Sequence, residues 1–363
     1  ADVTASGAIS GLGNLILADV GGTATFSNNV AAAALSAANT VANIIFTGST
    51  NTFSAASTLA NDGTLTFGDA TGDSFTFNGG LTTSSVAGTV TLNTSISSSD
   101  DNLIFGAITL GNNVTIDTNS TTTNRADITL AAITGGSNAL TLTTENNVTG
   151  SDVTASGAIA GVTTLTLASV GGTATLSGDV DVTTLAVDNT VLNVAFTGNG
   201  SSVANSFTPA NDGTFIFGAS GGTQTYNGGL NTASVGSTVT LNGSLVTSDD
   251  ALTLGAATLA SDVTLTSAGG AISTGAITGT STDDLIVTSS GGSTNTISLG
   301  AIGGSGNVHN VSATAGTSIT LTGNVTTANA SGNTVSLTAP SINIGNATID
   351  TNNTNHDGNV SFI

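Results

Sequence analysis

The stretch Asp2–Ile9, with the sequence DVTASGAI, recurs without change at Asp152–Ile159, 150 residues further along the chain (152 − 2 = 150). The NGGL sequence at Asn78–Leu81 recurs at Asn227–Leu230, where the offset has fallen to 149 (227 − 78 = 149). One residue has therefore been lost in a glycine-rich turn, and the apolar alternation stays in phase on both sides of it. This pattern indicates many short strands stacked in series.

The duplication pairs residues 2–117 with residues 152–266. No proline-rich or charged linker separates the copies, because the second copy starts in the middle of the pattern. We therefore expect residues 1–363 to form one continuous repeat segment without a separate globular domain.

Apolar and polar residues alternate along most of the chain. Examples are TVTLN at Thr89–Asn93, NVTID at Asn113–Asp117 and SITLT at Ser318–Thr322. Such alternation predicts half-buried β-strands with Val, Leu or Ile on one face and Thr on the other. The alanine-rich stretch Ala31–Ala38 could form a helix, but its repeat partner Asp181–Asp188 has a strand pattern, so we predict strand for both.

Strands that follow one another every 9 to 15 residues or so fit two all-β architectures. One is a parallel β-helix, or β-solenoid, and the other is a series of antiparallel β-sandwiches. Recurrent Thr and Asn, small interior residues and the lack of Trp and Cys favour the solenoid. With roughly 20 to 25 residues per coil the chain would hold about 15 to 18 coils, and at about 4.8 Å per coil it would form an elongated rod.

The composition excludes several classes of protein and of partner. Only 6% of the residues are charged, and 22 acidic residues stand against one basic residue, Arg125. We therefore expect no nucleic-acid binding, which needs clustered Lys and Arg. No apolar run is long enough for a membrane-spanning helix, so we expect no membrane insertion. Regular apolar triplets and only two prolines argue against disorder.

Both ends of the sequence have the pattern of an ordinary coil. Neither Ala1–Thr4 nor Asn359–Ile363 has the polar or helical character of a solenoid cap. We therefore predict that the coils continue in a longer chain or associate end to end with neighbouring molecules.

Two phrases carry a resemblance to a known family. They are GAITLGNNVTIDT at Gly106–Thr118 and ATAGTSITLTGNV at Ala313–Val325. Both are similar to the repeat regions of large bacterial surface proteins of the filamentous haemagglutinin type. The resemblance implies a right-handed parallel β-helix, export through an outer-membrane partner, an extracellular or cell-surface location, and roles in adhesion or biofilm matrix.

The amino-acid composition excludes most kinds of catalytic centre. The chain has no Cys and no Lys, and its two histidines, His309 and His356, fall in the unduplicated tail. Without these groups there is no thiol nucleophile, Schiff base or phosphate-loop lysine. We favour the interpretation that His356 is a solvated histidine in a turn. The alternative is a catalytic or metal site built from His356 and Asp357.

Adjacent carboxylates are candidate catalytic groups, because β-helix proteins include enzymes that cleave polysaccharides. Glycoside hydrolysis needs two carboxyls in a cleft with aromatic residues for the substrate, but the Phe residues here occupy inward-facing positions. We therefore predict no enzyme and no catalytic or cofactor-binding residue. The doublets are Asp100-Asp101, Asp249-Asp250 and Asp283-Asp284.

Calcium is the alternative role for the first two doublets. Ca²⁺ is bound by oxygen ligands such as Asp, Asn and backbone carbonyls, which are abundant in these turns. The calcium candidates are Asp100, Asp101, Asp249 and Asp250, although the glycine-rich calcium nonapeptide of other β-helices is absent. Turn carboxylates that face water remain the favoured interpretation.

The sequence thus predicts an extracellular structural rod of an adhesin, stalk, sheath or filament, stiff and resistant to proteases. The first alternative is an adhesin domain that presents Thr and Asn ladders to surface glycans. The second is a surface protein made of tandem antiparallel sandwiches, and the third is a polysaccharide-active enzyme.

Overall fold

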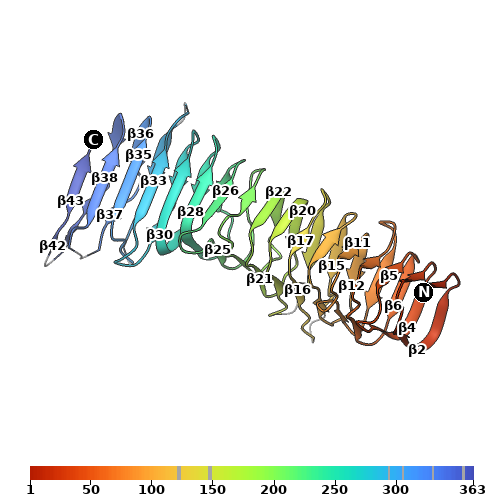
Figure 1. Ribbon diagram of the computed structural model, residues 1–363. Coiled ribbons are helices and arrows are strands. Elements are labelled where there is room, and N and C mark those ends of the chain that lie inside the picture. The colour runs from red at the N-terminus through yellow and green to blue at the C-terminus, as the bar shows by residue number, and fades with distance from the viewer. Residues whose placement is uncertain (121–123, 146–148, 293–294, 305, 329–330, 354–355) are drawn as a thin grey trace. The chain divides into compact units, whose positions relative to one another are not determined.

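The structure is a computed structural model that describes residues 1–363 apart from 121–123, 146–148, 293–294, 305, 329–330 and 354–355. The described residues form strands, turns and bends and no helix. The chain divides into two compact units, Ala1–Asn193 and Val194–Ile363. In each unit parallel strands stack as a β-solenoid, and the two units together hold about 16 turns (Figure 1). The predicted all-β solenoid is confirmed.

The strands of the first unit are short and are separated by tight corners. They are β1 (Val3–Ala5), β2 (Ile9–Leu17), β3 (Thr23–Phe26), β4 (Val30–Ala37), β5 (Asn43–Phe46), β6 (Thr50–Phe53), β7 (Ser57–Leu59), β8 (Leu65–Phe67), β9 (Ser74–Phe77), β10 (Leu81–Thr82), β11 (Val90–Leu92), β12 (Ser95–Ser97), β13 (Leu103–Ile104), β14 (Ile108–Leu110), β15 (Val114–Asp117), β16 (Ile128–Leu130), β17 (Ile133–Thr134), β18 (Leu140–Thr143), β19 (Val153–Ala155), β20 (Ile159–Ala168), β21 (Thr173–Leu176) and β22 (Val180–Val187).

Strand β23 (Asn193–Phe196) starts at the last residue of the first unit. The second unit continues with β24 (Ser202–Val203), β25 (Phe215–Phe217), β26 (Thr223–Tyr226), β27 (Leu230–Asn231), β28 (Val239–Thr247), β29 (Leu252–Leu254), β30 (Ala257–Ser267), β31 (Ile272–Thr274), β32 (Ile277–Thr278), β33 (Leu285–Ser289), β34 (Thr296–Leu299), β35 (Val311–Ala315), β36 (Ser318–Leu321), β37 (Val325–Thr326), β38 (Thr334–Thr338), β39 (Ser341–Asn343), β40 (Ile349–Asp350), β41 (Asn352–Asn353), β42 (His356–Asp357) and β43 (Asn359–Phe362).

Apart from β41 and β42, the described strands pair in parallel with their equivalents on neighbouring coils. In the first unit one such column runs through β8, β11, β14 and β17. The coil length within it varies from 18 residues, between Val90 and Ile108 (108 − 90 = 18), to 25, between Ile108 and Ile133 (133 − 108 = 25). Among the described strands β41 and β42 form an antiparallel pair. Because the strands of successive coils pair in parallel, the alternative of tandem antiparallel sandwiches is wrong.

The two copies of the duplication fold alike. Strand β4 (Val30–Ala37) covers most of the alanine-rich stretch, and its repeat partner is strand β22 (Val180–Val187), so the prediction of strand for both is confirmed. Corner conformations are repeated as well. Asp19 and the equivalent Ser169 both have positive φ angles, of 55° and 50°, and the backbone N–H of each donates to a threonine hydroxyl on the next coil.

The interior contains columns of aromatic rings. In the first unit Phe26, Phe46 and Phe67 stack from coil to coil, with ring centroids 4.8 and 5.9 Å apart. Every phenylalanine except Phe362 is buried, as the alternation predicts, and Tyr226 is buried with them. The interior in these coils is bulkier than the small-to-medium residues that the composition suggests.

Asn and Asp side chains at the corners bind the backbone of the next coil. In the first unit Asn102 accepts a hydrogen bond from the N–H of Asp127, Asp127 from that of Asp152, and Asp152 from that of Thr173, at 2.8 to 2.9 Å. The sequence predicts ladders in which side chains of successive coils meet. Side chains of successive coils do meet, as at Thr76 and Ser97. The corner side chains Asn102, Asp127 and Asp152 instead continue the backbone pairing at the residue before each strand begins.

Glycines stand where one corner lies directly on another. A Cβ added at Gly178 would lie 2.3 Å from the carbonyl carbon and oxygen of Gly157 on the preceding coil. A Cβ at Gly172 would lie 2.1 Å from Oδ1 of Asp152, the atom that binds the N–H of Thr173. Close approach of the coils therefore requires glycine at both positions.

One pair of core residues differs in kind between the copies. The positions of Phe75 and Phe77 are taken in the second copy by Gln224 and Tyr226, at the offset of 149. Tyr226 donates to Oε1 of Gln224 at 3.0 Å, and Nε2 of Gln224 donates to the carbonyl of Phe196 at 3.1 Å. Burial raises the pKa of Tyr226 above its ordinary value, so the phenol remains a donor.

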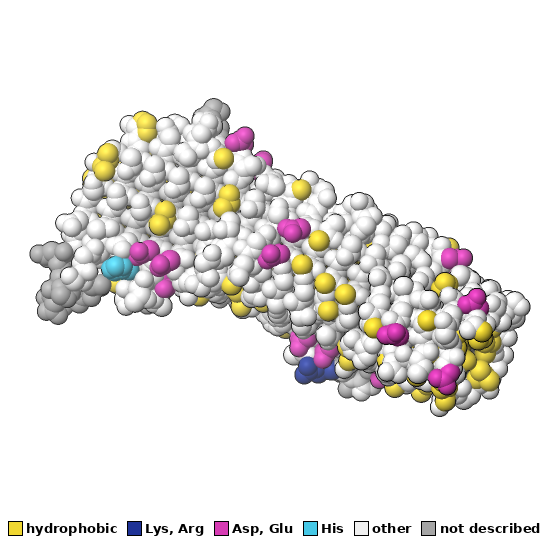
Figure 2. Space-filling view, viewed as in Figure 1, with side chains coloured by type: hydrophobic (Ala, Val, Ile, Leu, Met, Phe, Trp, Pro, Cys, Tyr) yellow, Lys and Arg dark blue, Asp and Glu magenta, His cyan; other side chains and the backbone are white. Residues whose placement is uncertain are grey.

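The surface of the solenoid is mostly neutral. In Figure 2 acidic side chains occur singly or in small groups on the visible face, between wide areas of uncharged residues. Threonine occupies outward positions in register, as at Thr66, Thr91 and Thr109. Among the described residues there is no helix of a length and apolarity that would cross a membrane.

Replacing Gly178 by Ala should destabilise the first unit by about 1–3 kcal/mol, because the added methyl group meets backbone and cannot be accommodated by a side-chain rotation. Gly72 is the matched control, since a Cβ there meets nothing within 4 Å. Gly72→Ala should be neutral or stabilising by up to ~1 kcal/mol. Denaturant unfolding of both variants measures the difference, and equal stabilities would contradict close corner stacking.

Tyr226→Phe should cost about 1–3 kcal/mol, because it leaves the buried Oε1 of Gln224 without its donor. The double variant Gln224→Phe with Tyr226→Phe restores the aromatic pair of the first copy and should recover most of that loss. A double-mutant cycle with Gln224→Phe should give a coupling of about 0.5–3 kcal/mol. Strictly additive effects would show that the two side chains act independently.

Candidate functional site

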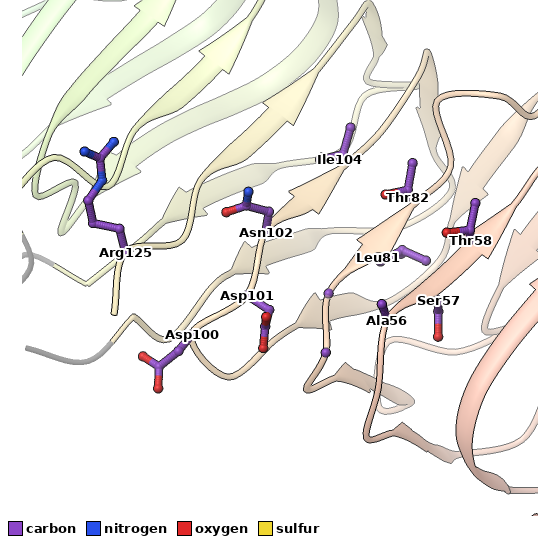
Figure 3. Close-up of a pocket in the computed structure, with 12 residues that line it drawn as sticks. Ala56, Ser57, Thr58, Leu81, Thr82, Asp100, Asp101, Asn102, Ile104 and Arg125 are labelled. Atoms are coloured by element: carbon purple, nitrogen blue, oxygen red, sulfur yellow. The ribbon is translucent and has the colours of Figure 1, made fainter. Parts of the chain in front are cut away.

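A groove of about 340 Å³ lies on a corner of the first unit (Figure 3). This volume is at the lower end of the range of small-ligand sites, and the groove is open to solvent. Its lining joins four successive coils and contains the first aspartate doublet and the chain's single arginine. The residues are Ala56, Ser57, Thr58, Gly79, Gly80, Leu81, Thr82, Asp100, Asp101, Asn102, Ile104 and Arg125.

One wall of the groove is a row of outward-facing residues. Strands β7, β10 and β13 pair in parallel, and their register brings Thr58, Thr82 and Ile104 side by side. Figure 3 shows the three side chains standing in line. Neighbouring strands are about 4.8 Å apart, so the two hydroxyl groups and the apolar side chain form an evenly spaced wall.

The floor is hollow because two glycines occupy the second of these coils. A Cβ at Gly79 would lie 2.3 Å from the carbonyl carbon of Ala55, so the coils are in contact there. Gly80 has a φ angle of 85°, and a Cβ on it would lie 3.4 Å from Cβ of Asp101. Any larger side chain at position 80 would fill the space in front of Asp101.

The doublet gives the groove its negative charge. Burial raises the pKa of Asp101 above its ordinary value, and the neighbouring carboxylate of Asp100 raises it further. Arg125 does not neutralise the doublet directly. Its guanidinium lies 3.9 Å from the carboxylate of Asp152, and Figure 3 shows it directed away from the side chains of Asp100 and Asp101.

The structure places the calcium candidates on two equivalent corners, one in each unit. The backbone carbonyls of Asp101 and Asp250 are already used, because they accept from the hydroxyls of Ser98 and Thr247. Oδ2 of Asp250 also lies 3.4 Å from the hydroxyl of Ser248. In the described part of the chain no three His, Cys, Asp or Glu side chains are grouped to hold a metal ion. Calcium binding at these corners stays a prediction.

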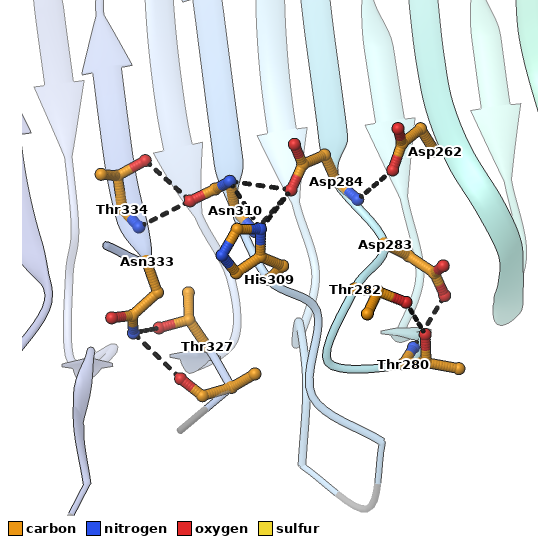
Figure 4. Close-up of polar contacts among 11 residues, drawn as sticks. Asp262, Thr280, Thr282, Asp283, Asp284, His309, Asn310, Thr327, Asn333 and Thr334 are labelled. Carbon is orange, nitrogen blue, oxygen red and sulfur yellow. Dashed lines mark hydrogen bonds and ion pairs between the residues drawn. The ribbon is translucent and has the colours of Figure 1, made fainter. Parts of the chain in front are cut away.

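A second polar cluster lies in the second unit and was not anticipated from the sequence. Oδ1 of Asp284 accepts from the backbone N–H of Asn310 at 3.1 Å and from Nδ2 of Asn310 at 2.8 Å. Nδ1 of His309 lies 3.0 Å from the same oxygen (Figure 4). The signal in the sequence is the separation of the Asp283-Asp284 and His309-Asn310 pairs by 26 residues, one coil of this solenoid (309 − 283 = 26).

This cluster belongs to a corner ladder like that of the first unit. Asp262 accepts from the N–H of Asp284, and Asn310 accepts from that of Thr334. Figure 4 shows the chain of contacts running from coil to coil. The histidine therefore adds to a structural contact between coils. The side chains of His356 and Asp357, considered as an alternative site, lie outside the described part of the structure.

Aromatic residues contribute nothing to either cluster. Of the aromatic rings only that of Phe362 is exposed, and it lies in the last strand. Neither the groove nor the histidine cluster therefore has the stacking surface that polysaccharide-cleaving sites commonly use.

Comparison of the chain with known protein families, with curated proteins and with solved structures found no match.

Asp101→Asn should stabilise the protein at pH 7, by up to about 0.5 kcal/mol, because it removes a carboxylate whose ionisation folding disfavours. A raised folded pKa means that stability is lost as pH rises from the unfolded value through the folded one. The difference between variant and wild type should therefore vanish below both values. Denaturant unfolding between pH 7 and pH 3 measures it, and a gap that widens towards low pH would contradict the assignment.

Proposed function

We propose that this chain is a structural segment of an extracellular, rod-forming surface protein of the filamentous haemagglutinin type. The observation that supports the proposal is the parallel pairing of strands from coil to coil in both units. Because parallel pairing recurs from coil to coil, such a structure can be lengthened without a new fold. A right-handed coil and export across an outer membrane follow from the resemblance and are part of this proposal.

We expect the chain to resist proteolysis, as this role requires. Arg125 is the chain's single Lys or Arg, so trypsin-like enzymes have one possible site. Strand backbones are paired on both sides within each unit, which removes the extended, unpaired segments that proteases bind. The absence of Cys, Met and Trp removes the side chains most easily oxidised outside a cell.

The terminal coils expose residues that are in core positions elsewhere. Val3 is 48% exposed although its partner Ala24 is buried, and Phe362 is 52% exposed although its partner Leu337 is buried. Each of these faces would bury apolar surface and pair its edge strand if a further coil were added. We propose that copies of this segment associate end to end through these two faces.

Electron microscopy and fibre diffraction of the native material test this function. We expect stiff fibres with an axial repeat of about 4.8 Å, located outside the cell by immunolabelling. Phe362→Lys should weaken end-to-end stacking of the isolated segment, whereas Ile286→Lys, at an exposed position away from the terminal coils, should not. Discrete globular particles, or labelling confined to the cell interior, would refute the proposal.

A further inference from the structure

Strands β1 (Val3–Ala5) and β43 (Asn359–Phe362) are each paired on one side among the described strands. Strand β1 pairs with β3, and β43 pairs with β38. The other edge of each strand presents backbone N–H and C=O groups to which a further parallel strand can bind. The end-to-end association proposed for this segment brings such edges together, and the choice of partner strand rests on that association.

The second copy of the duplication shows what covers an edge like that of β1. The sequence DVTA of Asp2–Ala5 recurs unchanged at Asp152–Ala155, where β16 pairs with the edge of β19. The backbone N–H of Asp152 donates to Oδ1 of Asp127, the residue before β16, at 2.9 Å. Among the described residues no side chain accepts from the N–H of Asp2. The edge of β1 therefore fits a strand that begins at a side-chain oxygen acceptor.

The last coil of the second unit has such an acceptor at the start of β43. In the corner ladder of this unit Oδ1 of Asn310 accepts from the N–H of Thr334 at 2.8 Å, and Asn359 lies opposite Thr334 on the next coil. No donor to Oδ1 of Asn359 is present among the described residues, so this oxygen can accept one further N–H. The residues before β39 and β40 are Pro340 and Thr348, which have neither an amide nor a carboxylate side chain. Strand β43 is therefore the one that can continue the ladder onto β1.

The inward-facing residues agree with this pairing. Val3 and Val360 lie opposite buried residues of the neighbouring coil, yet they are 48% and 42% exposed. We propose that β43 of one copy pairs in parallel with β1 of the next, with Val360 opposite Val3. Oδ1 of Asn359 then accepts from the N–H of Asp2, in the geometry of the corner ladders within each unit. A slip of one residue would turn the apolar side chains outward, and a slip of two would separate Asn359 from Asp2.

Introduced thiols report this register directly, because the chain contains no cysteine. Ser361 lies opposite Thr4 in the proposed register, with the two Cα atoms about 4.8 Å apart. This separation is within the range of about 4.4–6.8 Å that disulfides span. We expect the double variant Ser361→Cys with Thr4→Cys to form disulfide-linked oligomers with oxidised glutathione, seen on non-reducing gels and lost on reduction.

Two further double variants are the controls. Thr25 lies opposite Thr4 on the next coil, so a thiol there would be about twice as far from position 361, beyond the reach of a disulfide. Ser361→Cys with Thr25→Cys should therefore give no ladder of oligomers. Ser361→Cys with Ser6→Cys reports a slip of two residues and should likewise give none.

The amide of Asn359 is tested by its removal. Asn359→Ala should weaken association about two- to tenfold, because each junction loses one hydrogen bond. Asn199→Ala is the matched control, since Asn199 is exposed and lies away from both terminal coils, and it should change the affinity less than about twofold. Sedimentation velocity measures both variants, and unchanged circular dichroism establishes that they are folded. Equal affinities of the two variants would overturn the contact to Asp2.

The register and the rod function fail in different ways. Preferential cross-linking of the Ser6 variant over the Thr4 variant, in segments whose association Phe362→Lys still weakens, would overturn the register and leave the rod function intact. Segments that stay monomeric at every concentration tested would refute both.

Discussion

The hydrogen bonds between parallel strands of successive coils fix everything else in this structure. They hold neighbouring coils about 4.8 Å apart, so whatever lies on one coil must fit against the same position on the next. Bulky side chains fit inside, where Phe26, Phe46 and Phe67 stack. At the corners there is no such room, and glycines such as Gly178 lie directly on backbone. The high glycine content is thus a consequence of the spacing between coils.

The same spacing explains how this protein is stable with so little charge on its surface. Threonine occupies outward strand positions in register on successive coils. Charged residues at these positions would place like charges opposite each other, which threonine avoids. Where carboxylates do stack, as at Asp127 and Asp152, each is stabilised by a backbone N–H of the next coil. Asp152 also lies near the single arginine of the chain. Acidic residues are therefore tolerated mainly at corners, where they can extend the backbone pairing.

Alternation and the duplication were enough to predict the strands and their parallel stacking. TVTLN at Thr89–Asn93 became β11, and even the alanine-rich stretch followed the strand pattern of its repeat partner. The contacts between coils were not predictable, because coil length varies from 18 to 25 residues within one column. Without the register, Asp284 and His309 are merely 25 residues apart, and the groove beside Asp101 cannot be recognised.

The groove shows how the lining of a corner can differ between the two copies of the duplication. Both copies have the doublet and the glycines, so these belong to the corner and arise from the requirements of stacking. What differs is the lining: Asn102 and Ser57 in one copy, Ala251 and Phe207 in the other. The core shows the same freedom, since Gln224 and Tyr226 replace two phenylalanines without a change of strand pairing. Because backbone pairing maintains the fold, side chains at a few positions can change independently in each copy.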